Sequence, residues 1–134
     1  MRHRKNTVKL GRTSSQREAL FASLVSNLIL AKRIETTLPK ARAAKRMADK
    51  MVTIGKKDTL AARRHALSLL KQEKAVAELF GAVAPAMKER AGGYTRVLKL
   101  GKRMSDSSEM CILEWVDFVP KAKKEKKAKE EEAK

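Results

Sequence analysis

The side chains that most often carry catalysis are few in this 134-residue sequence and lie far apart. The two histidines are His3, close to the N-terminus, and His65, between an arginine and an alanine. Neither has a cysteine or carboxylate partner at the spacing of a metal site or a catalytic triad. We expect both to be structural or to contact phosphate rather than to act as acids or bases.

Glycine and hydroxyl motifs do not supply chemistry either. Gly92-Gly93 lacks the Gly-Lys-Ser/Thr ending of a nucleotide phosphate loop, and the sequence has no dinucleotide pattern of three spaced glycines. Ser14 and Ser15 suit helix capping better than nucleophilic attack, and the acids of the last predicted strand do not cluster as in a nuclease metal centre. The sequence therefore predicts no enzyme, no catalytic or metal-binding residue, no cofactor and no small-molecule substrate.

Positive charge is the chemistry that the chain does have. Lys and Arg total 32 against 15 Asp and Glu, a formal net charge of +17. So much charge on a small body opposes folding unless a polyanion neutralises it, and nucleic acid is the obvious polyanion. Hydrophobic residues make up 43% of the chain, too many for a wholly disordered basic tail. The composition predicts a folded, basic protein that binds nucleic acid.

The charge is concentrated in three blocks. Residues 2–12 carry five Lys or Arg and no acid, and residues 90–103 also carry five and no acid. Residues 32–57 carry nine basic side chains and two acids, a local charge of +7. An arm with no acid is more often a nucleic-acid arm than a means of keeping the protein soluble. Scattered basic patches, with no recognition helix or dimerisation seam, favour irregular RNA over DNA and no homo-oligomer.

The block at residues 90–103 places basic side chains beside two glycines. Gly92-Gly93 lets a phosphate approach the main chain, and Arg90 and Arg96 can pair with phosphate oxygens. Tyr94 can stack on an unpaired base. The alternative is a tight turn in which Tyr94 covers the edge of the core. The coincidence with uninterrupted positive charge favours RNA contact.

Cellular location follows from two further features. Cys111 is the only cysteine and lies in an apolar run, so a disulfide framework is excluded and a reducing cytoplasm fits. Polar residues interrupt the best apolar stretch near the N-terminus, at Ser23, Ser26 and Asn27. We therefore expect neither export nor a membrane span.

The elements that would hold these residues can be read from hydrophobic spacing and from caps. We predict a first helix from Ser15, where a capping box to Glu18 begins, to residue 31, and a second helix from residue 38 to the stop signal Gly55. A third helix is predicted from a cap at Asp58 to residue 70. A fourth is predicted from residue 73 to 80, ending near Gly81. The second helix buries one face and presents a basic one. Strands are predicted at 33–37, 94–100 and 110–116, the last two as a hairpin.

The predicted fold class is α+β, with about four helices packed on a small three-stranded sheet. We expect a basic RNA-binding arm at residues 1–13, one domain at 14–119 and a low-complexity charged tail at 120–134. The tail lacks aromatic or large aliphatic residues, so we expect it to be disordered. With four acids among its lysines, a solvated tail is favoured over an RNA-contacting one.

Three separated motifs resemble the family of bacterial large-subunit ribosomal protein seventeen. They are Met-Arg-His-Arg at the start, Glu35-Thr36-Thr37-Leu38-Pro39-Lys40-Ala41, and Arg90-Ala91-Gly92-Gly93-Tyr94-Thr95-Arg96. Their order and spacing match too, and the resemblance covers about residues 1–118. It implies a structural protein of the cytoplasmic ribosome, bound to large-subunit ribosomal RNA and neighbouring ribosomal proteins near the outer end of the nascent-chain exit tunnel.

The resemblance implies RNA contacts at the arm, at the start of the second helix and along residues 90–103. Together with the charge pattern, it gives the predicted RNA-binding residues: Arg2, His3, Arg4, Lys5, Lys9, Arg12, Lys40, Arg42, Arg46, Arg90, Gly92, Gly93, Tyr94, Arg96, Lys99 and Arg103. Composition alone would also fit a free nucleic-acid-compacting or RNA-chaperone protein. An RNA-modifying enzyme is a further alternative, which would require a function for His65 or Glu114.

Overall fold

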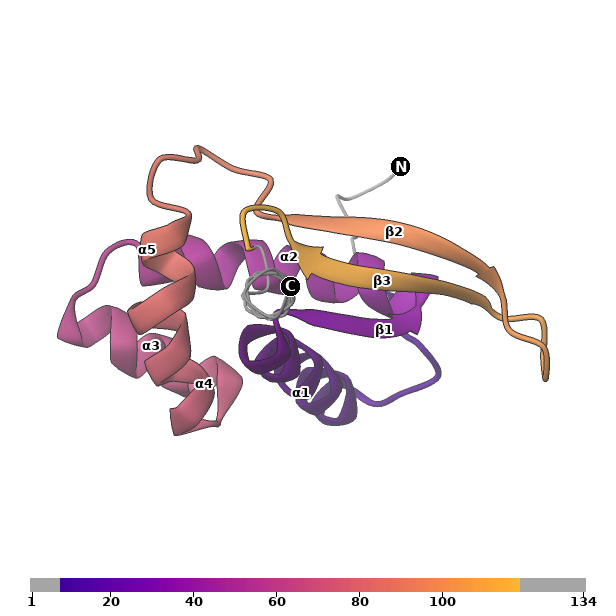
Figure 1. The fold of residues 1–134 in the computed structure, drawn as a ribbon. Coiled ribbons are helices and arrows are strands. Elements are labelled where there is room, and N and C mark those ends of the chain that lie inside the picture. The colour runs from indigo at the N-terminus through magenta and orange to yellow at the C-terminus, as the bar shows by residue number, and fades with distance from the viewer. Residues whose placement is uncertain (1–7, 119–134) are drawn as a thin grey trace, which may run out of the picture.

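The computed structural model describes residues 8–118, so the predictions for residues 1–7 and for the tail 120–134 lie outside the described part of the chain. In chain order, its elements are α1 (Ser14–Ala31), β1 (Arg33–Thr37), α2 (Leu38–Gly55), α3 (Leu60–Leu70), α4 (Glu73–Glu78), the π turn η1 (Leu79–Val83), α5 (Ala84–Ala86), β2 (Thr95–Lys102) and β3 (Glu109–Trp115). Figure 1 shows that α4, η1 and α5 follow one another directly and act as a fourth helix.

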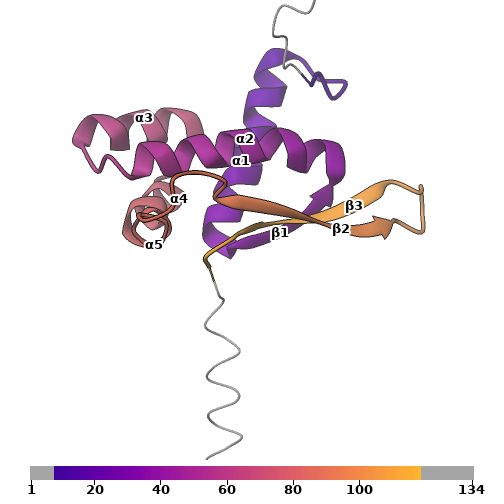
Figure 2. The ribbon, with the colours of Figure 1, turned by 90° about the horizontal axis from the view of Figure 1, so that it is seen from above.

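The three strands form one antiparallel sheet in the order β1-β3-β2, so the last strand lies in the middle. Thr36 of β1 lies opposite Cys111 of β3, and Thr95 of β2 lies opposite Trp115. Helix α2 contacts all three strands and covers one face of the sheet, and helix α1 crosses α2 (Figure 2). For residues 8–118, the predicted α+β arrangement of four helices and three strands is confirmed.

The core lies where α1 and α2 meet the sheet. Cys111, Leu113 and Trp115 alternate along β3 and are buried, as expected when one face of a strand packs inward. The indole N–H of Trp115 donates to the backbone oxygen of Leu28 in α1 at 3.0 Å. The largest buried side chain therefore also satisfies its one polar atom.

Helix α1 begins one residue earlier than predicted and uses a different capping box. Thr13 is the N-cap: its hydroxyl accepts from the backbone N–H of Gln16 at 3.5 Å, and the Gln16 side chain accepts from the Thr13 N–H at 3.2 Å. The predicted box from Ser15 to Glu18 is wrong. Thr13 and Gln16 have the same spacing, and Thr13 has the extended backbone that an N-cap requires.

Helix α3 is capped by Thr59 and not by Asp58. The Thr59 hydroxyl accepts from the backbone N–H of Ala62 at 3.2 Å. Asp58 instead has a left-handed backbone, with a φ of 41°, and its carboxylate accepts from Arg63 at 2.6 Å. The left-handed conformation prevents Asp58 from taking the extended N-cap geometry, so the cap moves one residue along the chain.

The fourth helix continues past Gly81, where the sequence predicted its end. Residues 79–83 widen into one π turn, in which the N–H of Ala84 donates to the carbonyl of Leu79, five residues back. Leu79 and Phe80 are buried. Burying each such side chain stabilises the segment by about 1.5–3 kcal/mol, whereas a glycine inside a helix costs only about 1 kcal/mol. Packing therefore carries the helix through the glycine.

Helix α2 ends in close contact with this fourth helix. A Cβ on Gly55 would lie 2.9 Å from the Cβ of Ala84 and 3.5 Å from the Cγ of Leu79. Gly55 is therefore needed for the close approach of the two helices, in addition to the predicted role as a stop signal.

The predicted hairpin is present, with strand ends shifted by one or two residues. Strand β2 extends to Lys102 through a β-bulge between Lys99 and Gly101, where Leu100 is the extra residue and Gly101 has a φ of 105°. Arg103 and Ser108 close the connecting turn through a backbone hydrogen bond of 2.8 Å. Figure 2 shows the end of this hairpin extending beyond the helices.

Candidate nucleic-acid interface

The described part of the predicted arm is a tight turn attached to α1. The backbone N–H of Arg12 donates to the carbonyl of Lys9 at 3.1 Å, and the guanidinium of Arg12 donates to the carbonyl of Leu10 at 2.8 Å. Arg17 of α1 donates to the carbonyl of Arg12 at 2.9 Å. Lys9 is exposed and Arg12 is half-buried. The other predicted arm residues, which lie outside the described residues, are Arg2, His3, Arg4 and Lys5.

The exposed side of α2 carries a row of positive charge. Arg42, Arg46 and Lys50 recur every four residues, so they share one side of the helix, and all three are exposed. Asp49, the one acid in the sequence of this helix, is drawn toward the sheet, because its Oδ1 accepts from the hydroxyl of Thr95 at 3.0 Å. The row therefore presents three positive charges with no acid of α2 among them.

Two further predicted residues lie at the start of the same helix. A cavity of about 230 Å³ separates the first turn of α2 from the hairpin, and Leu38, Lys99 and Lys102 line it. Lys40 is half-buried in that first turn, and Lys99 is exposed. The fold thus places Lys99 across this cavity from the first turn of α2, the turn that contains Lys40.

The loop before β2 leaves its main chain accessible. Gly93 has a φ of 63°, a left-handed conformation that favours glycine. A Cβ on Gly92 or Gly93 would meet no atom within 4 Å in the described structure. Packing therefore does not require a glycine at position 92, and a partner has room to approach this backbone.

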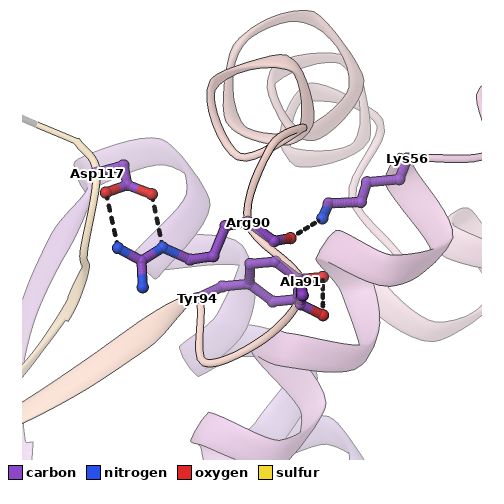
Figure 3. Close-up of polar contacts among 5 residues, drawn as sticks. All are labelled: Lys56, Arg90, Ala91, Tyr94 and Asp117. Atoms are coloured by element: carbon purple, nitrogen blue, oxygen red, sulfur yellow. Dashed lines mark hydrogen bonds and ion pairs between the residues drawn. The ribbon is translucent and has the colours of Figure 1, made fainter.

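Arg90 is held beside the loop by two contacts (Figure 3). Its Nε and Nη2 donate to the two carboxylate oxygens of Asp117 at 2.8 and 3.1 Å, and Lys56 donates to its backbone oxygen. These side-chain hydrogen bonds lower the pKa of Asp117 and raise the pKa of Arg90. Two of the five N–H groups of Arg90 are used, so three remain for a phosphate.

Tyr94 lies at the edge of the core rather than on the surface. It is 4% exposed, and the ammonium of Lys56 lies 4.5 Å from the centre of its ring. Its hydroxyl donates to the carbonyl of Ala91 at 3.4 Å (Figure 3). The structure therefore contradicts base stacking on Tyr94, because the ring has no open face for a base; the alternative, a ring that covers the core edge, describes its position.

Arg96 and Arg103 are also paired with carboxylates. Arg96 of β2 donates to Glu114, which lies opposite it on β3. Arg103 donates to both oxygens of Asp106 at 2.9 and 2.7 Å, and Ser108 donates to the same carboxylate. These hydrogen bonds lower the pKa of Asp106 well below its usual range.

The count of charged residues along the sequence did not predict these ion pairs, because residues 90–103 themselves contain no acid. The acids that follow the block fold back onto it. The predicted hairpin contained the signal, since residues directly opposite on antiparallel strands pair, and Arg96 faces Glu114 in the observed register.

Residues 8–118 lack two other kinds of feature. No group of three or more His, Cys, Asp or Glu side chains in this part of the chain is arranged to hold a metal ion. None of the described helices is both long and apolar enough to cross a membrane.

The sequence is similar to a known protein family. The model of a family described as "Ribosomal protein L17" matches residues 20–116. A protein of Thermodesulfovibrio yellowstonii named "Large ribosomal subunit protein bL17" is 48% identical over 134 residues, which are 100% of this chain and 98% of that protein. Proteins of the same name from Finegoldia magna (48% identical over 91% of this chain and 93% of the relative) and Fusobacterium nucleatum (46% over 87% and 100%) also match.

Proposed function

This chain belongs to the ribosomal protein L17 family, and from that membership we propose that it is a structural constituent of the large ribosomal subunit that binds ribosomal RNA through its basic surfaces. The family match spans most of the described domain, and the relatives are named as large-subunit proteins. The resemblance stated from three short motifs is thereby confirmed. The family is one of ribosomal proteins and not of enzymes, so the chain is a protein of the cytoplasmic ribosome without a catalytic role.

The observation that carries the RNA-binding proposal is the row of Arg42, Arg46 and Lys50 on the exposed side of α2. A helix holds its side chains at fixed spacing, so three cations 6 Å or so apart can meet successive phosphates with little loss of entropy. The carboxylate of Asp49 lies on the side of α2 that faces β2, where it accepts a hydrogen bond from the hydroxyl of Thr95. We propose that this row faces the RNA backbone and contributes affinity that depends on salt.

The other proposed contacts come from other parts of the fold. Lys40 lies in the first turn of α2, Lys99 lines the cavity beside that turn, and Lys9 lies in the turn before α1. The proposed set also contains the described residues Arg12, Arg90, Gly92, Gly93, Arg96 and Arg103, and it contains Arg2, His3, Arg4 and Lys5 outside the described residues. Arg90, Arg96 and Arg103 would bind phosphate with the N–H groups that their carboxylate partners leave unused.

Two finer statements rest on the family resemblance. We propose that the protein lies near the outer end of the nascent-chain exit tunnel, in contact with neighbouring ribosomal proteins, and that it does not form a homo-oligomer. A crosslinkable nascent chain that has just left the tunnel should react with this protein in stalled ribosomes. Reaction with other surface proteins but never with this one would contradict the tunnel location.

Competition between variants during subunit assembly tests the RNA-binding proposal. The double variant Arg42→Gln/Lys50→Gln and the control Lys74→Gln/Lys88→Gln remove the same charge from exposed positions. Each is co-expressed with the wild-type chain, and its share in purified large subunits is measured by mass spectrometry. The α2 variant should be underrepresented and the control should equal the wild type. Equal shares for both variants would contradict an RNA interface on α2.

Sedimentation tests the wider assignment. The protein should be found in the large-subunit peak of a lysate at moderate salt. A protein found mainly outside that peak would instead support the free nucleic-acid-compacting or RNA-chaperone alternative.

A further inference from the structure

The sheet has a second face, which no helix of the described chain covers. Helix α2 packs against one face, where Cys111 and Leu113 of β3 point inward. Because side chains alternate along a strand, Ile112 and Glu114 lie on the other face. That face looks away from α2 (Figures 1 and 2), and Arg42, Arg46 and Lys50 are on the exposed side of that helix. The open sheet face and the proposed RNA-binding row are therefore on opposite sides of the molecule.

The open sheet face differs from the rest of this basic protein in its charge. Glu114 lies between Arg33 of β1 and Arg96 of β2 and pairs with both, and its side chain is only 12% exposed. Glu35, the next outward-facing residue of β1, is exposed, and its carboxylate has no hydrogen-bond or ion-pair partner among the described residues. Among residues 8–118, two arginines and two glutamates make the face neutral, and the one charge left unpaired is the negative charge of Glu35.

The centre of the same face is apolar. Leu98 of β2 lies opposite Ile112 of β3, and Ile112 lies opposite Glu35 of β1. Leu98 is 39% exposed, Leu100 at the bulge is 52% exposed, and Ile112 is half-buried. These side chains form an apolar patch with a free carboxylate directly beside it.

We propose that the open sheet face binds a neighbouring protein, through a basic segment that places an apolar side chain over Leu98 and Ile112 and a Lys or Arg beside Glu35. The inference rests on the proposed function, because the partner is a protein assembled on the same RNA. Such a partner is expected to be basic, like this chain, and the free carboxylate is what a basic segment recognises on an otherwise cationic molecule. Burying the apolar patch would add the affinity that one exposed ion pair lacks.

Neither RNA nor the chain's own tail matches this face as well. A phosphate backbone laid over Leu98 and Ile112 would meet the carboxylate of Glu35, whereas Arg96 lies on the edge strand β2, beside the patch, where its unused N–H groups can reach RNA. The tail from residue 120 onward contains only Lys, Glu and Ala after its first proline, so its sequence has no large apolar side chain to cover Leu98 and Ile112.

Site-specific photocrosslinking in assembled large subunits tests the proposal. A photoreactive phenylalanine analogue replaces Leu98 in one full-length variant and Lys50 in a second, and the crosslinked products are identified by mass spectrometry and RNA sequencing. Position 98 should crosslink to another protein of the subunit, and position 50 should crosslink to RNA. Crosslinking of position 98 to RNA, to residues 119–134 or to nothing would overturn the docking proposal.

The probe at position 50 distinguishes failure of the docking proposal from failure of the proposed RNA-binding function. If position 50 reaches RNA while position 98 reaches no other protein, the proposed function stands and the docking inference fails. If neither variant enters large subunits although the wild type does, the same probes are placed at Leu100 and Arg46, and the same outcomes apply. A wild-type protein that is missing from large subunits would end both proposals.

Reversing the charge of Glu35 tests the chemistry of the partner. Glu35→Lys in the Leu98 crosslinking background should reduce the yield of protein crosslink about fivefold or more, because attraction to a basic residue becomes repulsion. Glu89→Lys, a matched change at an exposed position away from the sheet, should leave the yield unchanged. Equal yields from both variants would overturn a basic partner at Glu35.

Discussion

Replacing Gly55 by alanine should destabilise the protein, although alanine is the better helix former. The new Cβ would lie 2.9 Å from the Cβ of Ala84, and neither atom can rotate away because both are fixed to helix backbones. Overpacking of a filled core by a methyl group costs about 1–3 kcal/mol, and relief of the glycine penalty offsets about 0.5–1 kcal/mol. The free energy of unfolding should therefore fall by about 1–2 kcal/mol, and Tm by about 4–8 °C.

The matched control is Gly81→Ala, in the fourth helix. A Cβ at Gly81 would meet nothing within 4 Å in the described structure, so only the helix preference remains and the variant should gain about 0.5–1 kcal/mol. Urea unfolding of both purified variants, followed by circular dichroism, measures the two changes. A stabilised Gly55→Ala variant would refute the close packing of α2 against the fourth helix.

Three further predictions concern the candidate interface. Tyr94→Ala should lower the free energy of unfolding by about 3–5 kcal/mol, as loss of a buried aromatic ring does. Tyr94→Phe should leave stability and RNA affinity nearly unchanged. A large loss of RNA affinity in a stable Tyr94→Phe variant would show that Tyr94 contacts RNA. Arg42→Gln and Lys50→Gln should each reduce the slope of log affinity against log salt by about 1 in filter-binding titrations, and unchanged slopes would count against contact with phosphate. The pKa of Asp117 is lowered in the folded state, so its carboxylate should stabilise the protein at neutral pH. This contribution should be lost as the pH falls through the folded pKa. In urea unfolding, the stability advantage of the wild type over Asp117→Asn should therefore shrink from pH 7 to pH 3.

Much of the fold could be predicted because hydrophobic spacing reports burial directly. Strand β1 was predicted with its observed bounds, and both faces of α2 follow from residues three and four apart. The caps were harder: Thr13, Ser14 and Ser15 are three consecutive hydroxyl residues, and the structure gives the extended backbone of an N-cap to Thr13 rather than to the predicted Ser15. The passage of the fourth helix through Gly81 depends on contacts of Leu79 with distant segments, which local sequence does not contain.

The candidate site was predictable in composition and less so in geometry. Spacing alone places Arg42 and Arg46 on one exposed helix face. The carboxylate partners of Arg90 and Arg103 depend on how the chain folds back after the basic block, so a count of charges along the sequence overstated the charge that is free. Tyr94 is an amphipathic residue beside glycines, and its burial in the core, with Lys56 over its ring, depends on segments that are distant in the sequence.

Directed hydroxyl-radical cleavage tests the central claim, that α2 faces ribosomal RNA, most directly. The only native cysteine, Cys111, is fully buried, so a cysteine introduced at Lys50 can be labelled selectively with an iron chelate. In large subunits that contain the labelled protein, position 50 should cleave adjacent ribosomal RNA strongly above the background of the treated wild-type protein. Cleavage no greater than this background, in subunits shown to contain the variant, would contradict the claim.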